Sequence, residues 1–314
     1  MKMSEINFEC DLHCHTNRSD GNATPKEAID KAAARGLKVL ALTDHDIVPA
    51  TYIDTKEGQV TLVSYGKSKG IEIVPGIEVS CDTNVDDVHI LGLCCDFTYD
   101  FFQNLPDFVF KGKLDSSLKM IDELVKDGYE ISWEEILYND GNPLMPERVQ
   151  KKSIYDMLAK KGYVKTWQEG KLFVQANDRY NVRREKPDPL KTIKHIHNAG
   201  GTAVLAHPYL IKDVVKHNGK EMTRFEYIDM LVEAGLDGIE GCYTYNKTSY
   251  GGTLTKEEIE KEVRDRYEGK LKFISGGSDY HADEKKGVIN GRMQGECGVT
   301  REYFDRKIRP ILRM

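Results

Sequence analysis

The sequence lacks the features that mark several large classes of protein. No apolar run approaches the roughly 20 residues that a membrane-spanning helix requires. The first residues contain no apolar core of a signal peptide, so we expect a cytoplasmic location and no membrane partner. Basic residues are not in excess either, since the formal net charge is -6. A basic surface that forms a stable complex with nucleic acid is therefore not expected.

Cysteine patterns are also missing. The seven cysteines are odd in number and none forms a CxxC pair, which argues against a disulfide framework and against a structural zinc knuckle. No internal repeat or low-complexity linker is present, and Gly276-Gly277 lacks the lysine and the glycine spacing of a P-loop. The 314 residues are 39% hydrophobic and 31% charged. This composition is typical of a globular protein with a substantial core.

Helical and apolar strand patterns alternate along the first hundred residues. Thr24 as N-cap, a capping box with Glu27 and a stop signal at Gly36 predict a helix that begins at Pro25. A second helical segment is expected up to about Lys69. Residues 37–43 predict a strand of the buried kind found in parallel sheets, and apolar stretches predict further strands at residues 72–79 and 88–93.

The pattern changes between residues 101 and 186, where helical stretches predominate and the cations include Arg148. Strands are expected again at residues 202–206, 238–242 and 271–274, and a last helix at residues 301–312. Neither flanking part has enough strands to close a sheet alone. We therefore predict one barrel-like α/β body from residues 1–100 and 187–314, with residues 101–186 as an inserted helical domain that caps the substrate. Active sites of such barrels lie at the C-terminal ends of the strands.

Residues that can bind metal ions gather at these predicted strand ends. Residues 6–10 predict a further short strand. His13 and His15 continue it and are separated by one residue, so strand alternation places both on one side of the sheet. The full set, which includes six of the nine histidines, is His13, His15, Asp20, His45, Glu78, His89, His207, Asp279 and His281. These nitrogen and oxygen ligands would suffice for two or three divalent ions, with Mn(II), Zn(II) and Fe(II) as candidates. The lack of cysteine ligands favours a catalytic site over a structural one.

Several polar residues have a simpler interpretation. Asp44 and Asp46 alternate away from His45, so we expect them to orient a metal-binding imidazole or to form the turn. The remaining histidines are expected at the surface, at positions 195, 197 and 217.

The motifs around these residues resemble the PHP (polymerase and histidinol phosphatase) family. The resemblance rests on the His13-x-His15 pair and on Thr43-Asp44-His45-Asp46, Pro75-Gly76-Ile77-Glu78, the His89 strand, Ala206-His207-Pro208 and Ser278-Asp279-Tyr280-His281. It implies a distorted (β/α)7 TIM-like barrel with a centre of two or three metal ions, most often manganese. The helical insertion resembles the subgroup that acts on nucleoside 3',5'-bisphosphates and on the 5' ends of short RNA.

The resemblance also implies roles for individual residues. One ion would be bound by His13, His15, Glu78 and Asp279, a second by Glu78, His89 and His207, and a third by Asp20, His45 and His281. Arg148 would bind the substrate phosphate. In the mechanism that we expect, His207 contacts the substrate, and either His207 or a neighbouring metal-bound water protonates the leaving oxygen. Asp44 is the third residue for which we predict a catalytic role. The sequence has glutamine and lysine after Arg148, where the subgroup often has a histidine.

The sequence therefore predicts a free-standing, metal-dependent phosphoesterase that hydrolyses a small phosphorylated substrate through a metal-activated water. A nucleoside bisphosphate or the 5' end of a short RNA is the first candidate. Histidinol phosphate, amide hydrolysis and an accessory module of a polymerase remain alternatives. The sequence sets no expectation for the oligomeric state.

Overall fold

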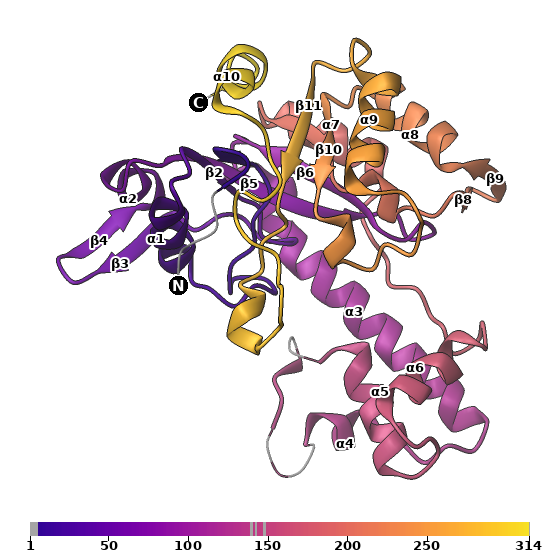
Figure 1. The fold of residues 1–314 in the computed structure, drawn as a ribbon. Coiled ribbons are helices and arrows are strands. Elements are labelled where there is room, and N and C mark those ends of the chain that lie inside the picture. The colour runs from indigo at the N-terminus through magenta and orange to yellow at the C-terminus, as the bar shows by residue number, and fades with distance from the viewer. Residues whose placement is uncertain (1–5, 139–140, 142, 147–148, 314) are drawn as a thin grey trace. The chain divides into compact units, whose positions relative to one another are not determined.

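The computed structural model describes residues 6–138, 141, 143–146 and 149–313. The chain divides into two compact units (Figure 1). The first unit comprises Met1–Leu105 and Pro187–Met314, and the second comprises Pro106–Lys186. Among the described residues, no helix is long and apolar enough to cross a membrane.

A mixed sheet forms the body of the first unit. In the described part of the chain it has seven strands, in the spatial order β1 (Cys10–Asp11), β2 (Val39–Leu42), β5 (Glu72–Cys81), β6 (Val88–Leu93), β7 (Thr202–Leu205), β10 (Gly238–Tyr243) and β11 (Phe273–Gly277). Neighbouring strands are parallel except at β6, which runs antiparallel to both β5 and β7. The C-terminal ends of the parallel strands therefore meet at one edge, and β6 brings its first residues to that same edge.

The two outer strands of the sheet approach each other and nearly close a barrel. Leu12 N–H donates to the carbonyl of Gly276 (3.2 Å), and Asp279 N–H donates to the carbonyl of His13 (2.8 Å). A Cβ atom at Gly277 would lie 2.3 Å from Cβ of His13, so only glycine allows this approach. The closure places the segment after β11 directly beside the segment after β1.

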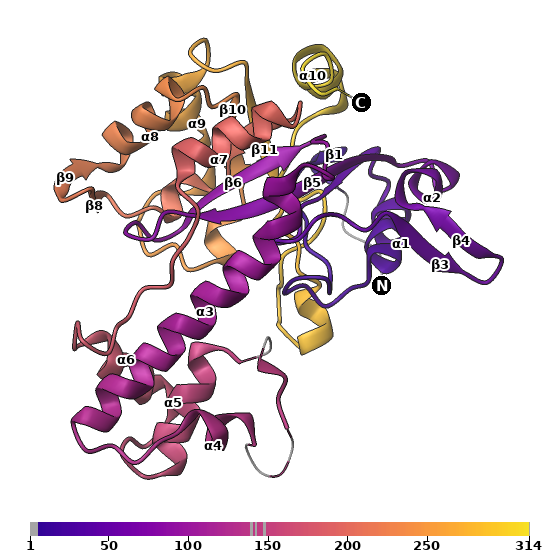
Figure 2. The same cartoon turned by 180° about the vertical axis from the view of Figure 1, so that it is seen from behind.

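Helices cover the sheet, and α7 packs on β6 and β7 (Figure 2). The helices of this unit are α1 (Pro25–Arg35), α2 (Leu62–Ser68), α7 (Pro189–Asn198), α8 (Arg224–Glu233), α9 (Lys256–Tyr267) and α10 (Arg301–Tyr303), the last continued by a π-helical turn. Two hairpins are formed by β3 (Tyr52–Thr55) with β4 (Gly58–Thr61) and by β8 (Val214–His217) with β9 (Lys220–Thr223). The strands of the sheet are buried, as their apolar character predicts.

The second unit has its own apolar core. Its helices are α3 (Asp100–Lys126), which begins in the first unit, α4 (Trp133–Leu137), α5 (Lys151–Lys160) and α6 (Trp167–Gln175). Met120 and Leu124 of α3 pack in one cluster with Ile154 and Leu158 of α5 and with Val174 of α6. This segment is helical, as the sequence predicts.

Local signals in the sequence locate α1 correctly. Thr24 accepts a hydrogen bond from Glu27 N–H (3.2 Å), Glu27 accepts one from Thr24 N–H (2.7 Å), and Gly36 has φ 90°. The prediction of a helical segment up to Lys69 is wrong in its first part, where the β3–β4 hairpin lies. The turn of this hairpin contains Gly58 at φ 118°. Most residues of its two strands are not buried, so the alternation of apolar and polar residues that predicts a strand is weak there.

Candidate metal centre

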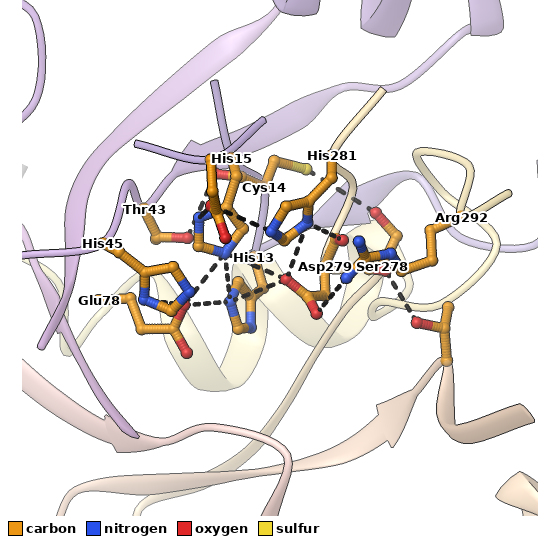
Figure 3. A network of polar contacts seen from close by, with 12 residues as sticks. His13, Cys14, His15, Thr43, His45, Glu78, Ser278, Asp279, His281 and Arg292 are labelled. Atoms are coloured by element: carbon orange, nitrogen blue, oxygen red, sulfur yellow. Dashed lines mark hydrogen bonds and ion pairs between the residues drawn. The ribbon is translucent and has the colours of Figure 1, made fainter. Parts of the chain in front are cut away.

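The predicted ligand residues come together at the C-terminal edge of the sheet (Figure 3). His13 and His15 follow β1, His45 follows β2, and Glu78 lies in β5. The other ligand candidates are Asp20 in the loop before α1, His89 in β6, His207 after β7, and Asp279 and His281 after β11. His89 is the second residue of its strand, and it reaches the same edge because β6 is antiparallel to its neighbours.

Glu78 lies at the centre of this group, and its side chain is 1% exposed. Both of its carboxylate oxygens are surrounded by imidazole nitrogens. The contacts are His13 Nε2 (3.0 Å), His15 Nε2 (3.0 Å) and His45 Nδ1 (3.2 Å) at Oε2, and His89 Nδ1 (2.9 Å) and His207 Nε2 (3.0 Å) at Oε1. The carboxylate thus connects the histidines of β1, β2, β6 and β7.

Asp279 and Asp20 extend the group on the side of β11. Asp279 Oδ1 lies 3.1 Å from His15 Nε2 and 3.5 Å from His13 Nε2. Asp20 Oδ1 lies 3.2 Å from His281 Nε2 and 3.8 Å from His15 Nδ1. The side chain of Asp20 is 56% exposed, whereas that of Asp279 is 10% exposed. Asp20 therefore forms the outer rim of the site.

Comparison with known proteins identifies a matching family model and several related proteins. The PHP domain family model matches residues 11–166. A 3',5'-nucleoside bisphosphate phosphatase from Chromobacterium violaceum is 30% identical over 305 residues, which cover 96% of this chain and 98% of the relative. A 5'-3' exoribonuclease from Haemophilus influenzae is 31% identical over 199 residues, which cover 63% of this chain and 68% of the relative.

The chain belongs to the PHP family. The solved structure of an amidohydrolase from Chromobacterium violaceum superposes with a TM-score of 0.61 at 25% identity, and the match covers 96% of both chains. The protein is thus a phosphoesterase of the PHP family, and its sheet forms a nearly closed mixed barrel. This result confirms the predicted family and fold class.

The donor atoms of the PHP site fit bound cations. In three groups of residues, each residue has one potential ligand atom, and these atoms all lie within 4.8 Å of one another. The groups are His15, Asp20, His45 and His281; His13, His15 and Glu78; and His45, Glu78 and His89. Donors around one ion lie roughly 3.0–3.4 Å apart when the bonds are about 2.1 Å long. His13 Nε2 and His15 Nε2 are 3.0 Å apart, and the buried His45 Nδ1 makes no hydrogen bond to any described residue. Such converging nitrogens are stabilised by a cation.

These groups differ in part from the grouping that the resemblance implies. His15 lies with Asp20, His45 and His281, in addition to its place beside His13. His45 also joins Glu78 and His89. The nine predicted ligands form one continuous cluster, in which His15, His45 and Glu78 each belong to two groups.

Electrostatics keep the carboxylates of the site charged. Burial alone would raise the pKa of Glu78 and of Asp279, but the imidazoles around them hold both pKa values well below the usual range. Burial alone would lower the pKa of His13, but Glu78, Glu240 and Asp279 outweigh it and hold that pKa well above its usual value. Burial dominates at His89 and lowers its pKa to about 3. Ionised carboxylate and neutral imidazole are the forms that bind metal ions. The carboxylates are thus in the binding form, and a bound cation would take the place of the proton that they favour on His13.

Glu240 of β10 is a functional candidate that the sequence analysis missed. It is fully buried, and its Oε1 lies 3.0 Å from His13 Nδ1. Its Oε2 accepts a hydrogen bond from His207 N–H (2.7 Å), where the His207 backbone has φ 30°. A carboxylate on Nδ1 fixes the ring so that Nε2 faces the metal. The signal in the sequence is a carboxylate within the apolar strand 238–242, which does not indicate which residue the carboxylate contacts.

Asp44, for which we predict a catalytic role, holds the loop that carries Asp20. Its carboxylate accepts hydrogen bonds from Thr16 N–H (2.7 Å), from the Thr16 hydroxyl (2.7 Å) and from the Ser19 hydroxyl (2.8 Å). The side chain is buried, and these three donors occupy it. Its contacts therefore support a structural role in the Thr16–Asp20 loop. Arg148, the predicted phosphate ligand, lies outside the described residues.

A cavity of about 580 Å³ opens over the ligand cluster. Its lining includes Glu78, His89, His207, Tyr243 and Arg292. The volume is within the range of about 300–1,000 Å³ that is typical of small-molecule sites.

Among the remaining histidines, the surface prediction is wrong for His217. It is 7% exposed and lies at the end of β8, where Nδ1 contacts Asp82 Oδ2 at 2.9 Å. His195 stacks on Phe101 (4.4 Å between ring centroids), and the side chain of His197 is 37% exposed. None of these three contributes to the ligand groups found among the described residues.

Proposed function

We propose that the protein hydrolyses a phosphate monoester or a short nucleotide substrate, namely a nucleoside bisphosphate or the 5' end of an oligoribonucleotide. The observation that carries this proposal is the cluster of nine nitrogen and oxygen ligands around Glu78 at the base of an open cavity. The names of the PHP relatives, a nucleoside bisphosphate phosphatase and an exoribonuclease, support the substrate class.

The same residues are proposed to hold two or three divalent ions, with Mn(II) as the first candidate. The ligands are His13, His15, Asp20, His45, Glu78, His89, His207, Asp279 and His281. When bound, such ions lower the pKa of a water molecule and neutralise the charge of the phosphoryl oxygens. The mixture of imidazole and carboxylate suits Mn(II), Zn(II) and Fe(II) alike.

The protein groups would act by orientation and by charge. Glu78 holds imidazoles of four strands around one carboxylate, which keeps the donor atoms in place before substrate arrives. We assign His207 to the metal ligands, because its Nε2 faces Glu78 and its Nδ1 is buried. Proton donation from His207 to the leaving oxygen has less support, since neither nitrogen is free in the cavity.

Release of inorganic phosphate, or of a mononucleotide in the case of the dinucleotide, tests the proposed activity. The metal-free protein is supplied with Mn(II) and assayed with a nucleoside 3',5'-bisphosphate, a mononucleotide, a 5'-phosphorylated dinucleotide and histidinol phosphate. We expect release from the bisphosphate or the dinucleotide, with the highest kcat/KM in the panel. Preference for histidinol phosphate would favour the alternative substrate, and no release from any member would contradict the proposal.

Substrate selection is proposed to involve the inserted unit and Arg148. Arginine presents a planar pair of donors that matches a phosphate group. Replacement of Arg148 by Ala should raise KM for the bisphosphate, with a small effect on kcat. Lys171→Ala removes an exposed cation from α6 of the same unit and should leave KM unchanged. Equal KM values for both variants would remove Arg148 from the site.

A further inference from the structure

The two carboxylate oxygens of Asp279 have different surroundings (Figure 3). Oδ1 faces the imidazoles of His13, His15 and His281 at 3.5, 3.1 and 3.4 Å. Oδ2 points away from them and accepts hydrogen bonds from the Tyr243 hydroxyl (2.7 Å) and from Arg292 Nη1 (2.7 Å). One oxygen is thus available to a cation, while protein donors occupy the other.

The Tyr243 hydroxyl is held rigidly. Tyr243 is the last residue of β10, is 1% exposed and has aromatic neighbours on two sides. Its ring centroid lies 5.2 Å from that of His207 and 4.8 Å from that of Tyr245. A ring packed in this way cannot follow Asp279 if the carboxylate rotates, so the hydrogen bond favours one orientation of the carboxylate.

Arg292 is aimed at Asp279 by a second carboxylate. Asp283 contacts the guanidinium at two atoms, Nε (2.9 Å) and Nη2 (3.2 Å), and also accepts a hydrogen bond from Arg292 N–H (3.2 Å). A Cβ atom at Gly291 would lie 2.6 Å from Cβ of Asp283, so glycine allows the loop to close around this pair. The two-point contact leaves Nη1 for Asp279, in the fork geometry that lysine lacks.

The backbone of Asp279 also needs support. Its φ is 51°, in the left-handed region that is uncommon for residues other than glycine. Strained positions of this kind persist where the surroundings fix them. Hydrogen bonds from two separate elements to Oδ2 supply that constraint.

We propose that Tyr243 and Arg292 are positioning residues, which hold Oδ2 of Asp279 so that the metal centre receives Oδ1 alone. This inference rests on the proposed metal centre. It explains why an arginine that lines the cavity is tied to two carboxylates. Loss of such partners behind a ligand typically lowers metal affinity or activity about 10- to 100-fold.

Metal titration of conservative variants tests the proposal. Tyr243→Phe keeps the ring and removes the hydroxyl, and Arg292→Lys keeps the charge and removes the fork. Titration of the metal-free proteins with Mn(II) alone should show a Kd about 10- to 100-fold above that of the wild type in the double variant. Each single variant should show a smaller increase.

The chain offers a matched control at Tyr227. Its hydroxyl also donates to Oδ2 of a buried aspartate at 2.7 Å, but that aspartate is Asp82, which belongs to none of the ligand groups found among the described residues. Tyr227→Phe should therefore leave the Kd for Mn(II) within about twofold of the wild type. If Tyr243→Phe and Arg292→Lys also bind Mn(II) like the wild type, the positioning role is wrong.

The remaining outcomes separate this role from substrate binding and from the proposed function. An Arg292→Lys protein with unchanged Mn(II) Kd and raised KM would show that Arg292 binds substrate, and would overturn its positioning role. A wild-type protein that binds no Mn(II), Zn(II) or Fe(II) would overturn the metal centre and this inference with it. Normal Mn(II) binding by all variants would overturn the inference and leave the metal centre intact.

Discussion

The first unit contains two buried clusters that are built from the same residue types. In the metal centre, histidines surround Glu78, and Tyr243 donates to Asp279. In the second cluster, His217 contacts Asp82 (2.9 Å) and Tyr227 donates to the same carboxylate (2.7 Å). Residue type and burial alone therefore do not distinguish a metal site from a structural one.

The clusters differ in how their polar atoms are satisfied. Asp82 Oδ1 accepts hydrogen bonds from Asn84 N–H (2.8 Å) and Val85 N–H (3.1 Å), in addition to the contacts at Oδ2. His217 Nε2 has the amide of Asn218 at 2.9 Å. The Asp82 cluster is thus complete with protein atoms, and it fixes the β8–β9 hairpin against the loop after β5.

The metal centre cannot be completed in the same way. Its nitrogen atoms face one another, as His13 Nε2 and His15 Nε2 do at 3.0 Å, and His45 Nδ1 has no hydrogen-bond partner among the described residues. Buried polar groups without partners are costly. Ring nitrogens that face one another, together with a buried nitrogen that makes no hydrogen bond, indicate a cation site. A histidine with a partner at each ring nitrogen, such as His217, indicates a structural role.

The largest expected effect follows from Glu78→Gln. Glutamine has the shape of glutamate but lacks its charge, and Glu78 contacts imidazoles at both carboxylate oxygens. We expect bound Mn(II), measured by elemental analysis, to fall by at least one ion per chain. Phosphate release should fall more than about 100-fold, which is the upper end of the loss expected when a residue that only contacts a metal ligand is replaced. Retention of both metal and activity would remove Glu78 from the centre.

Glu240→Gln should produce an intermediate effect. The carboxylate accepts from His207 N–H and lies against His13 Nδ1, and glutamine can replace the first contact better than the second. We expect the Kd for Mn(II) to rise about 10- to 100-fold. Circular dichroism should show an intact fold. A rise in Kd as large as that of Glu78→Gln would instead make Glu240 a direct ligand.

The sequence was informative about the cluster because most of its members lie at or close to the ends of predicted strands. His13, His15 and His45 follow predicted strands, and the C-terminal ends of parallel strands share one edge. The motifs of the family give the same residues. The helix α1 was equally easy to predict, since the residues that cap each of its ends are local in the sequence.

The supporting contacts could not be predicted because they join distant parts of the chain. His13 and Glu240 are 227 residues apart, and Asp279 and Tyr243 are 36 apart. In the sequence, Glu240 and Tyr243 each look like ordinary strand residues. The antiparallel direction of β6 is also a tertiary property, and it places His89 in the site from the beginning of its strand.

Asp82→Asn should affect stability and leave the metal centre unchanged. Burial would raise the pKa of Asp82, but hydrogen bonds from Tyr227, Asn84 N–H and Val85 N–H hold it below its usual value. We expect the free energy of unfolding at pH 7 to fall by about 1–3 kcal/mol, the cost of disrupting a buried charged acceptor. Phosphate release per folded molecule should equal that of the wild type.

The stability loss of Asp82→Asn should depend on pH in a defined direction. A carboxyl group with a lowered pKa in the folded state stabilises the protein above its unfolded pKa of about 3.9, and the contribution disappears as the pH falls through the folded pKa. Chemical denaturation should therefore show the full difference from wild type at pH 7 and a smaller one below about pH 4. A difference that grows on acidification would contradict the charged state of Asp82.

The smallest expected effect belongs to Tyr227→Phe, and it compares the two clusters most directly. The phenyl ring keeps the packing of a fully buried side chain, and Asp82 keeps three of its four hydrogen-bond contacts. We expect a loss of about 0.5–1.5 kcal/mol in the free energy of unfolding, the usual net value of one hydrogen bond. The same substitution at Tyr243 removes an equally short hydrogen bond, but its effect should appear in Mn(II) affinity. If both variants lose stability alone, the clusters do not differ in the way that their geometry indicates.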